Sequence, residues 1–248
     1  MSEASSCLAA SLPKARRWPT RSLALLRVAA VFGSTGWTVG SMAFVPDPRF
    51  ALHGWAGAVL HRLGVKIEVR GKLNHWPRLW VSNHLSWLDP LVLLSLRPMG
   101  ALAKGEVARY PLIGRAARKL GLSFVDREDA ASRASAVVRL STELLKGNPM
   151  LLFPEGTTTL GHGLAPLQEG GLRTAYRCGT AVQTLRLSSE DQGYPWVGDD
   201  TLLPHLLKIA QTPTTVVRLD AGKILGPQQF LCEDAWIEAI RQQLLPTP

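Results

Sequence analysis

From residue 65 to the C-terminus, short runs of apolar and β-branched residues alternate with segments of helical periodicity. Such alternation is typical of an α/β domain whose helices cover the faces of a sheet. We therefore predict one α/β domain with a mixed, mostly parallel sheet flanked by helices. The strands are expected at 65–69, 79–81, 102–104, 122–125, 151–153, 181–187 and 214–219. The helices are expected at 90–96, 106–120, 130–146, 172–177, 201–210 and 233–244. A chain of 248 residues fits one such domain with a short extension.

The extension combines a basic leader with an apolar segment. Five basic residues precede an uncharged stretch at 28–45, namely Lys14, Arg16, Arg17, Arg21 and Arg27. As a helix this stretch would reach about 27 Å, barely the thickness of a bilayer core. It also contains several Gly, Ser and Thr residues, so a spanning anchor, an interfacial helix and a buried core helix all remain open. A secretory signal competes with these readings, but the long polar leader and Arg27 weaken it.

A second helix is expected after the break at Pro46-Asp47-Pro48. Apolar residues recur at helical spacing through 52–63, and Gly64 closes the pattern. This helix would lie on lipid or on the protein core. We accordingly divide the chain into 1–64, a basic leader with membrane-associating helices, and 65–248, the globular domain. If 28–45 spans a membrane, the basic leader places the N-terminus in the cytoplasm.

Charge and cysteine content restrict the class of protein only loosely. The net charge of +9 suits an acidic partner, and anionic lipid, nucleic acid, an acidic carrier protein and a phosphorylated substrate all qualify. The three cysteines are few and widely spaced, which predicts free thiols in a reducing compartment. The sequence has no Walker or dinucleotide-binding loop, no G-x-S-x-G nucleophile motif and no His/Cys metal spacing.

The first candidate for chemistry is the motif NHLSWLD at 83–89, between an expected strand and an expected helix. His84 and Asp89 can meet only if the chain turns before the helix, because regular helix would set them about 140° apart. An imidazole oriented by a carboxylate is a suitable general base for a hydroxyl group. The competing interpretation is that Asp89 is an N-cap ahead of Pro90 and that His84 only packs.

The second candidate is the motif FPEGTTT at 153–159, which leaves an apolar strand. Loops at the carboxyl ends of such strands are common ligand sites. Gly156 permits close approach of the backbone, and the Thr hydroxyls and amides can donate to phosphate oxygens. Glu155 would have to accept from ligand hydroxyls or from a neighbouring cation. A simple Pro-x-Gly turn is the alternative.

A third group consists of cations at 104–127. Lys104 and Arg127 stand at the ends of expected strands and could meet a phosphate. The cations of the intervening helix are expected on a solvated or lipid-facing surface.

Three blocks in order make the chain resemble the PlsC-like lysophospholipid acyltransferases, the family of 1-acylglycerol-3-phosphate acyltransferases and their relatives. They are NHLSWLD at 83–89, KGE at 104–106 followed by FVDR at 124–127, and FPEGT at 153–157. The resemblance covers roughly residues 65–220. It implies that His84 is the base, that Asp89 orients it, and that Glu155, Gly156 and Thr157 belong to the acceptor site. Arg127 and Lys104 are the implied phosphate-binding residues.

The resemblance also implies the reaction and the location. An acyl chain would pass from acyl-CoA or acyl carrier protein to the hydroxyl of a lyso-lipid, at the cytoplasmic face of the inner membrane, with no metal, redox cofactor or nucleic acid. Many members have Arg where this chain has Thr158, and the later proline-rich strand is replaced by TAVQTL at 180–185. The Thr-rich loop and the stretch at 196–201 look like members that act on other lyso-lipids, including lyso-ornithine lipid. The rival functions are a catalytically silent lipid-binding protein of the same fold and an acyl thioesterase.

Overall fold

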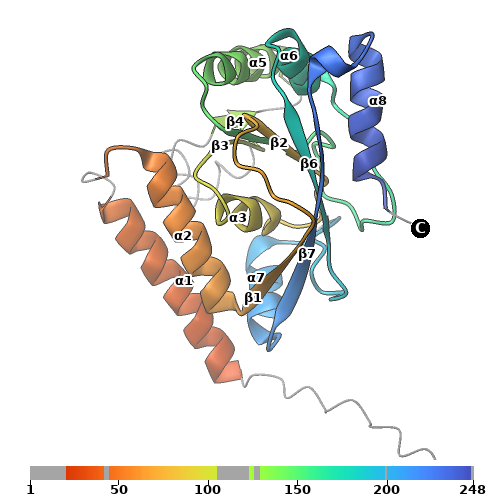
Figure 1. The fold of residues 1–248 in the computed structure, drawn as a ribbon. Coiled ribbons are helices and arrows are strands. Elements are labelled where there is room, and N and C mark those ends of the chain that lie inside the picture. The colour runs from red at the N-terminus through yellow and green to blue at the C-terminus, as the bar shows by residue number, and fades with distance from the viewer. Residues whose placement is uncertain (1–20, 42–44, 105–122, 126–128, 199, 247–248) are drawn as a thin grey trace, which may run out of the picture.

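A computed structural model describes residues 21–41, 45–104, 123–125, 129–198 and 200–246. Its centre is a seven-stranded sheet in the order β1-β7-β6-β2-β5-β3-β4 (Figure 1). Only the β6–β7 pair is antiparallel. The predicted mixed, mostly parallel sheet is therefore confirmed. The strands are β1 (Val65–Arg70), β2 (Leu79–Ser82), β3 (Gly100–Lys104), β4 (Ser123–Val125), β5 (Met150–Leu152), β6 (Val182–Ser188) and β7 (Thr215–Leu225).

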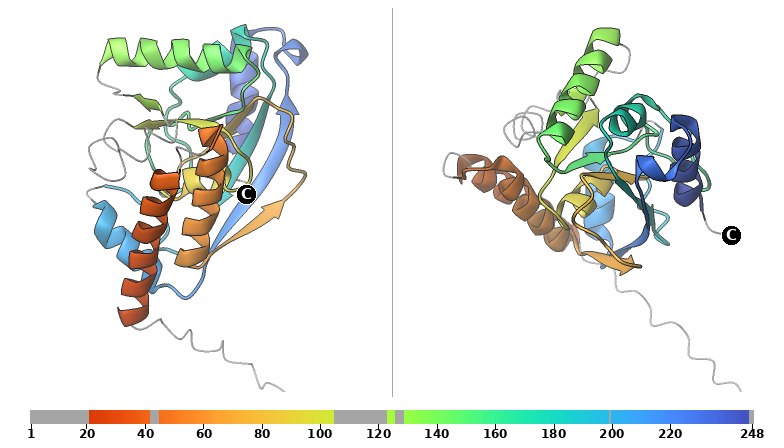
Figure 2. Two further views of the ribbon diagram at one scale, coloured as in Figure 1. Left: turned by 90° about the vertical axis from the view of Figure 1, so that its left-hand side faces the viewer. Right: turned by 45° about the horizontal axis from the view of Figure 1, so that its top comes forward.

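Helices cover both faces of this sheet, as Figures 1 and 2 show. Side chains alternate along each strand, so neighbouring residues enter different cores. Trp80 and Leu151 pack in the core under α1, α2, α3 and α7, whereas Leu79 and Leu152 pack in the core under α5, α6 and α8. The helices are α1 (Arg21–Ser41), α2 (Pro48–Leu63), α3 (Asp89–Leu94), α5 (Ala130–Leu145), α6 (Gly170–Arg177), α7 (Leu202–Gln211) and α8 (Glu233–Leu244), with the 3-10 helix η3 at Pro227–Gln229.

The expected elements agree with the structure, with two qualifications. The helix expected at 106–120 lies outside the described residues. Strand β7 continues to Leu225 instead of ending at 219, because its second half pairs with β6 after its first half has paired with β1. A partner strand, rather than the local apolar pattern, sets the length of β7.

The two N-terminal helices form a hairpin along one flank of the domain (Figure 2). Helix α1 is long and apolar enough to cross a membrane by length and composition, with a mean hydropathy of 1.3. It begins before the expected stretch, so Arg27 lies inside the helix instead of flanking it. The Arg27 guanidinium donates to the carbonyls of Ala210 and Thr212, which terminate α7. Helix α1 is thereby fixed to the globular domain.

Helix α2 begins within the expected break, four residues before the apolar pattern starts at 52, and ends at Gly64 as predicted. Asp47 accepts from the backbone N–H of Arg49 as the N-cap, and Gly64 ends the helix with φ 73°. Leu52, Leu60 and Leu63 on one face are buried in the core shared with α3. Of the two surfaces considered for this helix, the buried face lies on the protein core.

Candidate active site

The site lies where β2, β5 and β6 end, because the carboxyl ends of parallel strands meet at one edge of the sheet. Asn83 fixes the turn that leaves β2. Its Nδ2 donates to the carbonyl of Leu187 (3.0 Å), and its Oδ1 accepts from the Leu187 N–H (2.7 Å). The buried Asn83 amide thus continues the β2–β6 ladder beyond the last strand residue and holds the next residue, His84, at the strand end.

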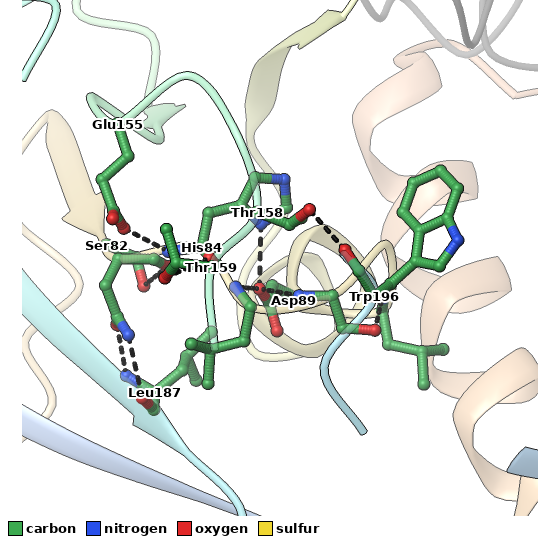
Figure 3. Close-up of polar contacts among 12 residues, drawn as sticks. Ser82, His84, Asp89, Glu155, Thr158, Thr159, Leu187 and Trp196 are labelled. Carbon is green, nitrogen blue, oxygen red and sulfur yellow. Dashed lines mark hydrogen bonds and ion pairs between the residues drawn. The ribbon is translucent and has the colours of Figure 1, made fainter. Parts of the chain in front are cut away.

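His84 and Asp89 contact each other, with 2.9 Å between Nδ1 and Oδ2 (Figure 3). The same carboxylate oxygen accepts from the backbone N–H of Leu85 (2.5 Å) and of Ser86 (2.8 Å). Asp89 is completely buried. Since a buried carboxylate is stable only when its oxygens are hydrogen-bonded, the loop at 84–89 folds around this group.

The N-cap expected at Asp89 is wrong. Asp89 is the first residue of α3, and its carboxylate points back into the preceding loop rather than forward onto the first turn of the helix. The backbone donors come from Leu85 and Ser86 because the chain turns sharply there, with the Asp89 N–H donating to the Ser86 carbonyl. This turn before the helix is the one that a direct contact between His84 and Asp89 requires.

The imidazole of His84 is held in one tautomer and one plane. An ionised carboxylate can only accept, so the contact with Asp89 places the ring proton on Nδ1 and leaves the lone pair on Nε2. The ring stacks on Phe153, with 4.3 Å between centroids and 24° between planes. The side chain is 17% exposed, and within the described part of the chain Nε2 has no hydrogen-bond partner. Nε2 is therefore arranged to accept a proton.

Glu155 lies on the other side of His84, as Figure 3 shows. Its Oε1 accepts from the His84 backbone N–H (2.8 Å), and its Oε2 accepts from the Ala165 N–H (2.8 Å). Burial raises the pKa of the Glu155 carboxyl, against the lowering effect of these two donors. The carboxylate thus joins the loop after β2 to the loop after β5 and to the segment at 165–168, whose Gln168 N–H donates to the Pro154 carbonyl.

The four residues after Glu155 differ in their exposure and in their hydrogen-bond partners. Gly156 is buried with φ 73°, a left-handed conformation that favours glycine, and Thr157 is exposed. The hydroxyl of Thr158 donates to the Trp196 carbonyl, and that of Thr159 donates to the His84 carbonyl (3.3 Å). The hydroxyls of Thr158 and Thr159, which could also have donated to a phosphate, are thus hydrogen-bonded to neighbouring loops, and of the three Thr residues only Thr157 is exposed.

The two implied phosphate-binding residues are placed only in part. Lys104 ends β3, which neighbours β5, so its backbone lies at the same edge of the sheet as the loop at 153–159. Arg127 lies outside the described residues. Across the described ranges, no group of three or more His, Cys, Asp or Glu residues could hold a metal ion.

The sequence did not indicate two contacts that the loop after β6 makes with the site. The hydroxyl of Tyr194 donates to Asp89 Oδ1 at 2.5 Å, and the Trp196 N–H donates to the Leu85 carbonyl at 2.8 Å. Tyr194 is completely buried. In the sequence, Tyr194 stands out only because Trp196 follows two positions later in a mostly polar loop. This aromatic pair does not indicate which residue Tyr194 contacts.

Because both oxygens of the Glu155 carboxylate accept from backbone N–H groups, the effect of replacing this residue can be predicted. In Glu155→Gln one accepting oxygen becomes an NH₂ group that must face a backbone N–H. We expect a loss of about 1–3 kcal/mol in the free energy of unfolding, measured by denaturation of the purified protein. Glu190→Gln, a change at a side chain that is 78% exposed, should have little effect. An unchanged free energy of unfolding in Glu155→Gln would show that this carboxylate does not hold the loops together.

Comparison with known proteins identifies the family. Residues 66–188, about half of the chain, match the model of the family described as Acyltransferase. A lyso-ornithine lipid O-acyltransferase of Pseudomonas aeruginosa is 38% identical over 157 residues, which are 61% of this chain and 60% of that protein. The chain belongs to the acyltransferase family.

One further curated protein and one solved structure are also similar to this chain. A 1-acyl-sn-glycerol-3-phosphate acyltransferase of Neisseria meningitidis is 26% identical over 194 residues, covering 74% of this chain and 76% of the relative. The crystal structure of the 1-acyl-sn-glycerophosphate acyltransferase PlsC from Thermotoga maritima superposes with a TM-score of 0.66 at 16% identity, covering 90% of this chain and 92% of the other. The fold of this chain is therefore that of PlsC.

Proposed function

We propose that this chain is an O-acyltransferase that moves an acyl group from a thioester, acyl-CoA or acyl carrier protein, to the hydroxyl of a lyso-lipid. The observation that carries the proposal is the contact between His84 Nδ1 and the buried Asp89 carboxylate, which leaves the His84 Nε2 lone pair available. Family membership supports the same reaction. Acyl transfer between a thioester and an alcohol changes no oxidation state, so the proposal needs no redox cofactor and assigns none.

The proposed steps use His84 as a base and then as an acid. Nε2 takes the proton of the lyso-lipid hydroxyl while the hydroxyl oxygen attacks the carbonyl carbon of the thioester. Asp89 stabilises the imidazolium that forms. Backbone amides or water stabilise the oxyanion. When the tetrahedral intermediate collapses, the C–S bond breaks and the imidazolium returns its proton to the departing thiolate. The products are an ester and a free thiol.

For the acceptor we propose a lyso-ornithine-type lipid ahead of lysophosphatidic acid. The P. aeruginosa relative is named a lyso-ornithine lipid O-acyltransferase and is 38% identical, against 26% for the N. meningitidis relative named for 1-acylglycerol-3-phosphate. Thr158 supports this order, because its hydroxyl bonds to the Trp196 carbonyl and it supplies no guanidinium for a phosphate. Glu155, Gly156 and Thr157 are proposed for the acceptor site, and Lys104 and Arg127 for the polar headgroup.

The proposed place of the reaction is the cytoplasmic face of the inner membrane. Helix α1 supports association with a membrane by its length and composition. The net charge of +9 suits anionic lipid headgroups and an acidic acyl carrier protein.

An acceptor panel tests the proposed function. The purified full chain is incubated with a radiolabelled thioester and, in turn, lyso-ornithine lipid, lysophosphatidic acid and lysophosphatidylcholine. We expect labelled diacyl product with lyso-ornithine lipid at a kcat/KM at least about tenfold above that with lysophosphatidic acid, a difference of about 1.4 kcal/mol in transition-state binding. The reverse order would reject the acceptor assignment. Labelled free acid independent of acceptor would indicate a thioesterase, and no product from any acceptor would indicate a silent lipid-binding protein.

A further inference from the structure

The two oxygens of the Asp89 carboxylate differ in the number of hydrogen bonds that they accept. Oδ2 accepts from His84 Nδ1, from the Leu85 N–H and from the Ser86 N–H. Oδ1 has one hydrogen-bond partner within the described residues, the hydroxyl of Tyr194, at 2.5 Å. Because Asp89 and Tyr194 are both completely buried, water is not at hand to replace that donor. Removal of the hydroxyl would leave one oxygen of a buried charge unsatisfied, an expensive state.

The loop that carries Tyr194 is fixed before it reaches Asp89. The Asp191 carboxylate accepts from the Gly193 N–H (2.9 Å) and, through its other oxygen, from the Thr215 hydroxyl (3.1 Å) at the start of β7. The Tyr194 N–H donates to the Asp191 carbonyl (2.9 Å). These bonds form a tight turn anchored to the sheet, so Tyr194 arrives at Asp89 with its backbone already ordered.

The same loop also hydrogen-bonds to the turn that contains His84. The Trp196 N–H donates to the Leu85 carbonyl, directly after His84, and the Trp196 carbonyl accepts from the Thr158 hydroxyl. Trp87, in the middle of the motif, donates from its indole N–H to Nδ1 of His205 on α7 (2.8 Å). The turn is thus held from the β6–α7 side as well as from the β5 side.

We propose that Tyr194 is a positioning residue for proton transfer, holding Asp89 and through it His84. This inference rests on the proposed function. Burial and the neighbouring Asp89 carboxylate raise the pKa of the Tyr194 phenol well above its ordinary value, so the group remains a neutral donor. By donating to Oδ1, the Tyr194 hydroxyl stabilises part of the negative charge on the Asp89 carboxylate and fixes the carboxylate in one rotamer. His84 then experiences a weaker negative charge than it would beside an Asp89 without this donor, while the other carboxylate at this turn, Glu155, keeps its two backbone donors.

Tyr194→Phe tests the role, because it removes the hydroxyl and keeps the ring. We expect kcat to fall about tenfold with KM for the lyso-lipid nearly unchanged. The acid limb of the pH–rate profile should move upward by about half a unit, because the Asp89 charge beside the base is no longer shared with the Tyr194 hydroxyl. Tyr176→Phe is the matched control. Its ring packs beside Trp236 on the opposite face of the sheet, with no hydrogen bond from its hydroxyl in the described structure.

A purely structural role would lower kcat or stability without moving the acid limb, and that result would overturn the inference. 3-Fluorotyrosine at position 194 keeps the fold if the Phe variant is unstable. The fluorinated phenol is a stronger hydrogen-bond donor than tyrosine, so the acid limb of the pH–rate profile should move downward. An acid limb that does not move would also overturn the inference. The pH dependence of His84 carbethoxylation, read by peptide mass mapping, measures the same shift without turnover. Failure of the proposed function would abolish wild-type transfer, whereas failure of this inference would leave the carbethoxylation midpoint unchanged in Tyr194→Phe.

Discussion

Replacement of His84 by Ala should reduce acyl transfer at least about 1000-fold in purified, folded protein. The variant loses the group that takes the hydroxyl proton, while the backbone N–H that binds Glu155 is kept. Binding of the lyso-lipid should therefore remain close to that of the wild type. The measurement is the initial rate of labelled product formation, together with lipid binding by calorimetry or fluorescence.

His162→Ala is a matched control for this change. His162 is exposed in the loop that follows the motif at 153–159, so its removal deletes an imidazole near the site in the sequence without touching Asp89. We expect near-normal transfer from this variant. If His84→Ala retained the wild-type rate, a general-base role for His84 would be untenable.

Asp89→Asn is expected to cause the second-largest loss, about 100-fold or more in kcat. The amide oxygen can still accept at the Oδ2 position, where three donors converge, so the NH₂ group must turn toward Tyr194. The His84 tautomer is then preserved, but the negative charge that stabilises the imidazolium is gone. Rate measurements across pH should show a loss that higher pH does not restore.

The control for that variant is Asp234→Asn, which makes the same chemical change at a side chain that is 77% exposed. It should leave kcat unaltered. A wild-type kcat in Asp89→Asn would mean that the carboxylate charge does nothing for catalysis and that Asp89 only builds the turn.

The central part of the site could be predicted because its signals are local. His84 and Asp89 are five residues apart, and the strand before them and Pro90 after them indicate a strand-turn-helix unit. The resemblance to a family in which the two motifs occur in this order places Glu155 at the same site. Its bond to the His84 backbone, across 71 positions, was not foreseen.

The rest of the site could not be predicted because it depends on long-range contacts. Tyr194 bonds to Asp89 across 105 positions, and Thr158 bonds to Trp196 across 38 positions. A Thr hydroxyl can serve a ligand or a neighbouring carbonyl equally well, and only the arrangement of the loops decides between them. The overlong β7 has a similar cause, since its second half is a strand because β6 lies beside it.

The most direct test of the pair as a catalytic unit is a double-mutant cycle in the transfer assay. Initial rates are measured for the wild type, His84→Ala, Asp89→Asn and the double variant at saturating thioester and lyso-lipid. If Asp89 acts through His84, the double variant should be no slower than His84→Ala alone, because the carboxylate has no base left to serve. Losses that multiply, with the double variant about 100-fold below His84→Ala, would contradict a single catalytic unit.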